Sequence, residues 1–96
     1  MLTIYKGEDF KEITKNKVLV DFYASWCGPC KMLGPILEKL SSEFDIVKID
    51  VDEYPDLARE YGVMSIPTLI LFDEGKETKK TIGFLPEEEL REFVTK

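Results

Sequence analysis

Residues 24–31 read Ala24-Ser25-Trp26-Cys27-Gly28-Pro29-Cys30-Lys31 and contain both cysteines and the only tryptophan of the chain. An apolar run over residues 18–23 precedes them, and a helical pattern over residues 32–44 follows. This order predicts a strand, a tight turn with a thiol at its tip, and a helix. A thiolate of Cys27 is stabilised there, because the start of a helix has unpaired backbone N–H groups and partial positive charge. Cys30 lies three residues further on the same helix face, so the two sulfur atoms can bond and separate without unfolding.

The length and composition predict one domain, residues 1–96, with a core of its own. An apolar content of 44% and a charged content of 33% are ordinary for a globular protein. No apolar run approaches the roughly 20 residues that a membrane-spanning helix needs. Residues 1–6 lack the basic segment, long apolar stretch and cleavage site of a signal peptide. We therefore expect a cytoplasmic protein that does not bind membranes.

The charge and the residue types exclude several classes of site. A net charge of −6 argues against nucleic-acid partners, because phosphates are neutralised by a basic face. The chain has no histidine, which removes Ser-His-Asp and Cys-His catalysis. Two cysteines without histidine cannot supply four zinc ligands from one chain, so no metal site is expected.

The rest of the chain predicts the alternating strands and helices of an α/β fold. Strands are expected at residues 2–5, 18–23, 46–52, 68–72 and 77–82, and helices at residues 8–15, 32–44, 55–61 and 86–94. Strand–helix–strand units favour parallel pairing, while a hairpin turn with Gly75 at a positive φ adds an antiparallel edge. Pro35 lies inside the second helix and predicts a kink. The nearly all-apolar strand at 18–23 is expected at the centre, with helices covering both faces of the sheet.

Three roles fit the pair Cys27 and Cys30: a redox dithiol, a structural disulfide, or half of a zinc site shared between two chains. A structural disulfide that closes so short a loop stabilises little, because the loop-closure entropy is small. A C-x-x-C sequence in a βαβ setting, without a secretion signal, favours the redox dithiol.

Asp21 is the one acid in the central apolar strand. An isolated carboxylate in an apolar strand is costly to ionise, so we expect a raised pKa and a role in moving the proton that Cys30 loses. The alternative is a solvent-facing Asp21; perturbed carboxylates gather at active sites, which favours function. Lys48, on the next strand, either pairs with Asp21 or is solvated.

Three other residues near the cysteines or the strands have two interpretations each. Pro67 begins a strand or sits at a bend, and the sequence alone favours a trans turn proline over a cis bond. Trp26 is either core or part of a docking surface, and its place beside the reactive turn favours docking. Gly83 either ends a strand or lets a partner backbone come close.

Together these residues resemble the thioredoxin family over essentially the whole chain. The resemblance rests on residues 20–31, which include Trp26-Cys27-Gly28-Pro29-Cys30-Lys31, and on Pro35, Lys48, Asp50, Asp52, Ile66-Pro67-Thr68 and Gly83. It implies a central four- to five-stranded mixed sheet flanked by four helices. A bare C-x-x-C is weak evidence, whereas this set is very specific.

The resemblance also implies a role for each residue of the site. Cys27 becomes the exposed attacking thiol, Cys30 the buried resolving thiol, and Asp21 the buried acid–base group with Lys48 as its neighbour. Pro67 becomes cis and faces the dithiol. A flat docking surface is implied, to which the Ile66 backbone adds an extended substrate segment as a strand. Its residues are Trp26, Gly28, Pro29, Ile66 and Gly83, extended by Met64 and Phe84.

The implied activity is that of a general protein-disulfide reductase, an electron carrier with no bound cofactor beyond the redox-active Cys27–Cys30 disulfide. Its implied partners are disulfide-containing target proteins and a thioredoxin reductase that uses NADPH, and the chain is expected to be a monomer. Tyr23 stands where many relatives have a second tryptophan, and Ser65 where some have glycine.

Three rival functions remain at this point. The first is an oxidase or isomerase of the same fold, against which Gly28-Pro29 argues, because related isomerases carry a histidine there. The second is a binding module that never turns over. The third is glutaredoxin-like use of glutathione, disfavoured because that family usually carries Pro-Tyr between the cysteines.

Overall fold

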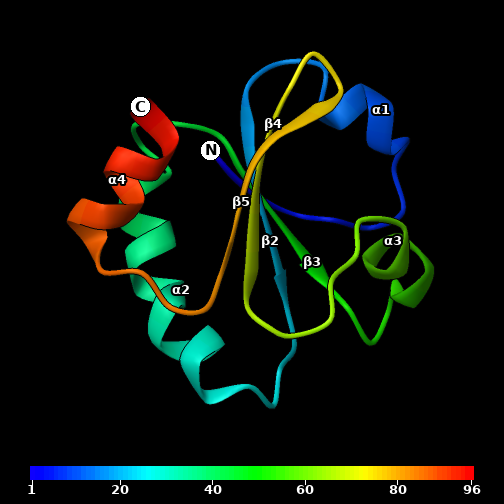
Figure 1. Ribbon diagram of the computed structural model, residues 1–96, viewed down its shortest axis with the longest axis horizontal. Helices are drawn as coiled ribbons and strands as arrows, with labels where there is room; N and C mark the ends of the chain where they lie inside the picture. Colours follow the sequence, from blue (N-terminus) through cyan, green and yellow to red (C-terminus); the bar gives the residue numbers. More distant parts are fainter.

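The computed structural model describes residues 1–96 as one five-stranded mixed sheet with four helices (Figure 1). The strands are β1 (Leu2–Ile4), β2 (Val18–Tyr23), β3 (Ile46–Asp50), β4 (Thr68–Asp73) and β5 (Lys76–Ile82). The helices are α1 (Phe10–Ile13), α2 (Gly28–Leu40), α3 (Pro55–Glu60) and α4 (Glu87–Thr95). The predicted α/β class and element order are confirmed. None of the helices is long and apolar enough to cross a membrane.

β2 is the central strand of a sheet with the order β1-β3-β2-β4-β5. It pairs parallel with β3 and antiparallel with β4, and its first five residues are buried. The apolar and β-branched side chains of residues 18–23 suit this position, because a strand buried on both faces has no polar side. β1 lies at one edge of the sheet, as expected for a short first strand.

The connection from β3 through α3 to β4 differs from the expected parallel unit. β4 runs antiparallel to β2, and therefore also to β3. The chain between β3 and β4, residues 51–67, returns to the end of the sheet at which β3 leaves it instead of crossing the face of the sheet, so the prediction of parallel pairing was wrong for this unit. Helix length does not decide this, because the shorter α1 lies between β1 and β2, which run parallel.

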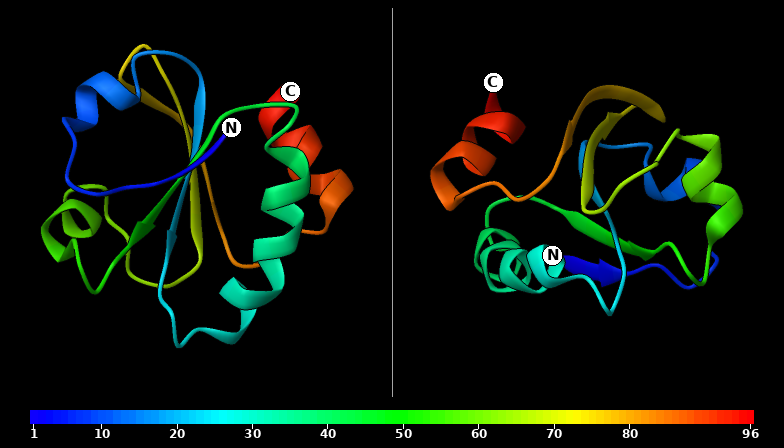
Figure 2. Two further views of the ribbon diagram at one scale, coloured as in Figure 1. Left: turned by 180° about the vertical axis from the view of Figure 1, so that it is seen from behind. Right: turned by 60° about the horizontal axis from the view of Figure 1, so that its bottom comes forward.

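The helices cover the sheet in two layers, α2 and α4 on one face and α1 and α3 on the other (Figure 2). Successive residues of β2 alternate between them: Val20 and Phe22 join the cluster under α1 and α3, and Leu19 joins the cluster under α2 and α4. By the same alternation, Asp21 and Tyr23 lie on the face covered by α2 and α4. This alternation places the anomalous acid of the central strand beneath the helix that carries the cysteines.

The ends of several elements differ from the sequence pattern. α1 has four residues instead of eight, with the Asp9 carboxylate accepting from the Lys11 backbone N–H at its start. α2 begins at Gly28 and contains Pro35, and its ribbon bends after the first turns, as a helix-interior proline predicts (Figure 1). The hairpin turn has positive φ at both Glu74 (+56°) and Gly75 (+76°). Only the glycine was expected to adopt that conformation.

Candidate active site

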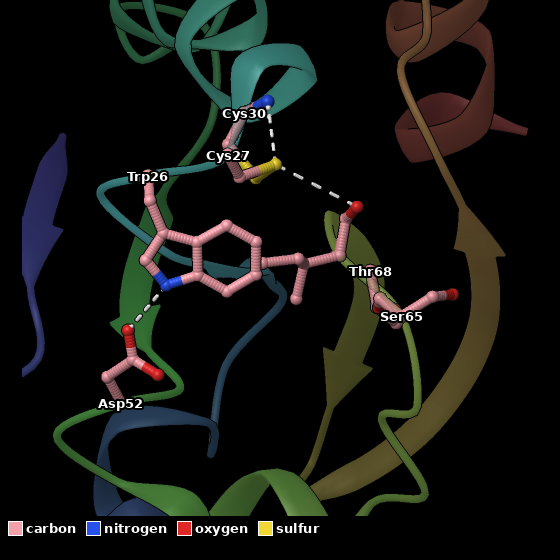
Figure 3. The surroundings of a disulfide bond; sticks show 7 residues. Trp26, Cys27, Cys30, Asp52, Ser65 and Thr68 are labelled. Atoms are coloured by element: carbon pink, nitrogen blue, oxygen red, sulfur yellow. Dashed lines mark hydrogen bonds between the residues drawn. A yellow bond between two sulfur atoms is a disulfide. The ribbon is translucent and has the colours of Figure 1, made fainter.

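The two cysteines lie at the start of α2, directly after the turn that leaves β2. Cys27 is the N-cap residue of α2, and its Sγ accepts from the Cys30 backbone N–H at 3.2 Å (Figure 3). The two residues form a disulfide, with their Cα atoms 5.2 Å apart. Pro29 occupies the first turn, where its missing N–H removes no helical hydrogen bond. The expected arrangement, a sulfur at a helix N-terminus with its partner one turn on, is therefore present.

Exposure does not distinguish the two sulfurs. Cys27 and Cys30 are each 5% exposed, so the expectation of an exposed Cys27 was wrong for this disulfide form. The reason is local packing: both pack with Ala24, and Ile66 closes over them, its carbonyl oxygen 3.8 Å from Cys27 Sγ. What separates the pair is position on the helix, since Cys27 precedes the first turn and Cys30 lies within it.

The loop before β4 forms the wall opposite the disulfide. The Ile66–Pro67 peptide bond is cis, which the family resemblance implied and which the sequence alone did not favour. Thr68 Oγ1 donates to the Ser65 carbonyl at 2.6 Å, and the Gly83 N–H donates to the Pro67 carbonyl at 2.8 Å. Gly83 has a φ of +97°, with open space where a Cβ would be. The wall is therefore tied to the end of β5 through the Gly83 backbone.

Asp21 is 1% exposed, and neither of its carboxylate oxygens has a hydrogen-bond partner. Burial raises its pKa to about 7, while the positive charge of Lys48 acts in the opposite direction. The solvent-facing alternative is thereby excluded. A carboxyl with a pKa near neutrality takes up and releases a proton readily at physiological pH.

Lys48 lies directly opposite Asp21 in the parallel pairing of β2 with β3. The two do not form the ion pair that was one of the expected alternatives. Instead, Lys48 Nζ lies over the ring of Tyr23, 4.4 Å from its centroid. Lys48 is half-buried, so its side chain keeps part of its contact with solvent.

Trp26 is a surface residue, 67% exposed, and not part of the core. Its indole N–H donates to Asp52 Oδ2 at 2.8 Å (Figure 3). Beside it lies an apolar groove of about 390 Å³, lined by Trp26, Val51, Val63, Met64, Ser65 and Ile66. Gly28 and Pro29 are also exposed near the disulfide, while Phe84, expected to extend the docking surface, packs instead against the α2 and α4 cluster.

Asp52, Val51 and Val63 were not assigned to the site from the sequence, although they contact or line it. A signal for Asp52 was present, because Trp26 follows β2 and Asp52 follows β3. The carboxyl ends of neighbouring parallel strands meet at one edge of a sheet. Val63 gave no comparable signal, since it lies in the loop between α3 and β4.

The assembled groups suit reversible two-electron exchange between a dithiol and a disulfide. The helix start stabilises a thiolate at Cys27, the second sulfur is already within bonding distance, and a titratable carboxyl lies in the same sheet face. No group of three or more His, Cys, Asp or Glu side chains is arranged to hold a metal ion.

Comparison with known proteins gives one consistent result. A family model described as Thioredoxin matches residues 2–96. The chain is 54% identical over 93 residues to Thioredoxin of Staphylococcus aureus, an alignment that covers 92% of this chain and 89% of that protein. Among solved structures, it is similar to a mutant thioredoxin from Halobacterium salinarum NRC-1 (TM-score 0.89, 39% identity, 97% and 86% coverage). It is also similar to Malassezia sympodialis Thioredoxin (TM-score 0.87, 34% identity, 99% and 89% coverage).

Proposed function

The chain belongs to the thioredoxin family, and from this premise we propose a role for each residue of its dithiol site. The activity itself follows from the family and from the cysteine pair: the chain is a protein-disulfide reductase that works by thiol–disulfide exchange. The observation that carries the proposal is the disulfide between the N-cap residue of α2 and the residue one turn on.

Cys27 is the attacking thiol of the proposed cycle. Its thiolate attacks one sulfur of a target disulfide, a new bond forms between Cys27 Sγ and that sulfur, and the other target sulfur leaves as a thiolate. The helix N-terminus favours this thiolate, and the Cys30 N–H that donates to Cys27 Sγ stabilises the same charge. The product is a mixed disulfide between the chain and its target.

Cys30 is the resolving thiol and Asp21 its proton acceptor. Cys30 loses its proton to the Asp21 carboxylate, directly or through a water, and attacks Cys27 Sγ. The bond between Cys27 and the target breaks, and the second target sulfur leaves as a thiolate. The target has then gained two electrons, and the chain has become the Cys27–Cys30 disulfide. The raised pKa of Asp21 supports this role, because an acid–base group works best when its pKa lies near the working pH.

The target binds along the groove next to the disulfide. The exposed Trp26 ring, the exposed Gly28 and Pro29, and the Ile66 backbone bound a surface that suits an extended segment carrying a cystine. The Ile66 carbonyl already faces Cys27 Sγ, which suits backbone pairing with such a segment. Pro67 and Gly83 keep this wall in place through their backbone hydrogen bond.

The finer physiological assignments are part of the same proposal and rest on the family resemblance and on the sequence. Residues 1–96 act as one thioredoxin domain, supported by the family match over residues 2–96, and the protein acts as a monomer in the cytoplasm. The targets are disulfide-containing proteins, and a thioredoxin reductase that uses NADPH restores the dithiol after each cycle. Neither nucleic acid nor a membrane surface is a partner.

The first test separates a reductase from a binding module. Cys27→Ser is expected to abolish reduction of a protein disulfide, while Cys30→Ser is expected to accumulate a mixed disulfide at Cys27 with that protein. A mixed disulfide at Cys30 in the Cys27→Ser variant, with none at Cys27 in the other variant, reverses the two roles. Disulfide reduction that continues in Cys27→Ser contradicts the mechanism.

The second test separates a reductase from an oxidase or isomerase. Equilibration with defined dithiol buffers gives the reduction potential of the Cys27–Cys30 pair. A reductase is expected to lie below about −200 mV, whereas a value above it indicates an oxidase or isomerase.

A further inference from the structure

Lys48 lies opposite a buried carboxylate but forms no hydrogen bond with it. The strand register places it directly across from Asp21, whose two oxygens are without partners. Its ammonium instead lies over the Tyr23 ring, one step along the same face of the sheet. A cation over an aromatic face is attracted by the ring, and more so where water is partly excluded.

The ammonium also borders the resolving cysteine. A shallow cavity of about 240 Å³ is lined by Tyr23, Ala24, Ser25, Cys30, Lys31, Gly34 and Lys48. Lys48 and Tyr23, from the sheet, thus line the same cavity as Cys30, from the start of α2. A positive charge there acts on both groups that exchange the proton, the Cys30 thiol and the Asp21 carboxyl.

We propose that Tyr23 is a positioning residue for the exchange reaction, with its ring holding the Lys48 ammonium at the cavity beside Cys30. This inference rests on the proposed role of Asp21 as the proton acceptor. Tyr23 packs against the cluster of Ala24, Cys27 and Cys30, and its proposed effect on the proton exchange is exerted through Lys48.

Among the charged groups near Asp21, Lys48 is the one through which we expect Tyr23 to change the pKa of Asp21. From β3, Lys48 is the cation that opposes the effect of burial on Asp21. From β4, the residue opposite Asp21 is Leu69, which does not titrate. From α2, the titratable groups at the cavity that Lys48 lines are Cys30 and Lys31. Burial chiefly raises the pKa of Tyr23, and the charges of Asp50, Glu53 and Asp21 raise it further.

Without the ring, the strongly hydrated ammonium of a flexible lysine is expected to swing into solvent. The Asp21 carboxyl then loses the charge that opposes its burial, and its pKa rises further. Tyr23→Phe keeps the aromatic face and so is the matched control, whereas Tyr23→Leu removes it.

The experiment is a titration of the Asp21 carboxyl by NMR in the reduced protein, in four chains: unmodified, Tyr23→Leu, Tyr23→Phe and Lys48→Met. We expect Tyr23→Leu and Lys48→Met each to raise the pKa of Asp21 by about half a pH unit or more, and Tyr23→Phe to leave it unchanged. Adding Tyr23→Leu to Lys48→Met is expected to produce no further change. The pH midpoint of mixed-disulfide resolution is expected to move with this pKa.

Two results of the titration would overturn the inference. If Tyr23→Leu shifts the pKa of Asp21 equally with and without Lys48, the ring acts through burial alone. If Tyr23→Leu shifts nothing, the ring does not hold the ammonium. An independent measurement needs no variant: the Lys48 ε-methylene protons must show the upfield shift of a ring current, and its absence contradicts the proposal.

Failure of the underlying mechanism has a different signature. If the pH midpoint of resolution stays fixed while the pKa of Asp21 moves among these variants, Asp21 is not the proton acceptor. The positioning of Lys48 by Tyr23 would then stand without its catalytic consequence.

Discussion

The two faces of the sheet are filled in different ways. Under α1 and α3, the core is rich in aromatic rings: Phe10 and Phe72 pack edge to face, and Tyr61 packs on both. Under α2 and α4, the core is mostly leucine, but β2 contributes Asp21 to that side. The cluster under α1 and α3 consists of apolar and aromatic side chains, which gain from burial, whereas the second face also holds a carboxylate that loses by it. The second face thus gives up stability at the residue that we propose as the proton acceptor of the dithiol.

Phe72→Ala tests the first face and has the largest expected effect on stability. Phe72 is fully buried between Phe10 and Tyr61, so its truncation leaves a cavity that the rings cannot fill. We expect the free energy of unfolding, measured by urea titration, to fall by about 3–5 kcal/mol. Phe72→Leu, which keeps most of the volume, is the control and should lose less. The reduction potential of the cysteine pair is expected to stay unchanged. A large shift in that potential would show that the packing of the first face also affects the dithiol on the second.

Asp21→Asn tests the second face through the pH dependence of stability. The folded-state pKa of Asp21 lies above its ordinary value of 3.8, at about 7, so the folded chain keeps a proton that the unfolded chain has released. Stability is therefore lost as the pH rises between these two values. From pH 5 to pH 8 this group alone costs about 2–3 kcal/mol.

The measurement is urea unfolding of the oxidised protein at pH 5 and pH 8, so that the cysteines do not titrate. The asparagine variant is expected to lose this decrease, even though its buried amide also lacks a partner. An equal decrease in both proteins would show that another group is responsible.

Most of the fold could be predicted because its signals are local. The apolar run of residues 18–23 and the alternation of residues 46–52 identified β2 and β3, and Gly75 identified the hairpin. The direction of β4 was mispredicted because it depends on the end of the sheet to which residues 51–67 return the chain. The order of elements does not contain this, since α1 connects two parallel strands and α3 two antiparallel ones.

The site was predictable where a residue type is chemically anomalous in its setting. Two cysteines at a helix start and an acid in an apolar strand each point to chemistry without any tertiary information. The position of the Lys48 side chain was not predictable, because Asp21, Tyr23 and solvent all lie within its reach. The exposure of Cys27 was mispredicted because it depends on Ile66, which lies 39 residues further along the chain.

Thr14→Val offers a milder comparison with Asp21. Thr14 is also fully buried and polar, yet its hydroxyl donates to the Phe10 carbonyl at 2.8 Å. Because the hydroxyl is hydrogen-bonded, its replacement in Thr14→Val is expected to lower the free energy of unfolding by about 0.5–1.5 kcal/mol. Urea titrations should give the same decrease at pH 5 and at pH 8, because the hydroxyl does not titrate. A stabilised variant would show that burying this hydroxyl costs more than its hydrogen bond contributes, and the contrast with the unpaired carboxylate of Asp21 would fail.

A substitution of Arg91 on α4 is expected to have the smallest effect on stability, because its ion pairs lie at the surface above the second face. Its guanidinium makes a two-pronged contact with Glu43, Nε to Oε1 at 3.0 Å and Nη2 to Oε2 at 2.8 Å, and also pairs with Glu87 and Glu88. Glu43 follows α2, so this contact joins α4 to the end of that helix. Hydrogen bonds from Arg91 lower the pKa of Glu43, and those from Lys39 and Arg91 lower that of Glu87.

Arg91→Ala is therefore expected to lower the Tm by about 2–4 °C at pH 7 and low salt. Since the carboxylates have lowered pKa values, their contribution is present above the ordinary pKa of 4.5 and is lost as the pH falls through the folded-state values. The difference between variant and parent should shrink in 1 M salt, at about a 3 Å Debye length, and disappear in acid. Arg59→Ala, which removes one fully exposed pair with Asp56, is the matched control and should change the Tm less. A difference that persists in high salt and acid would show that Arg91 acts by packing its stem on α2 and not by its charge.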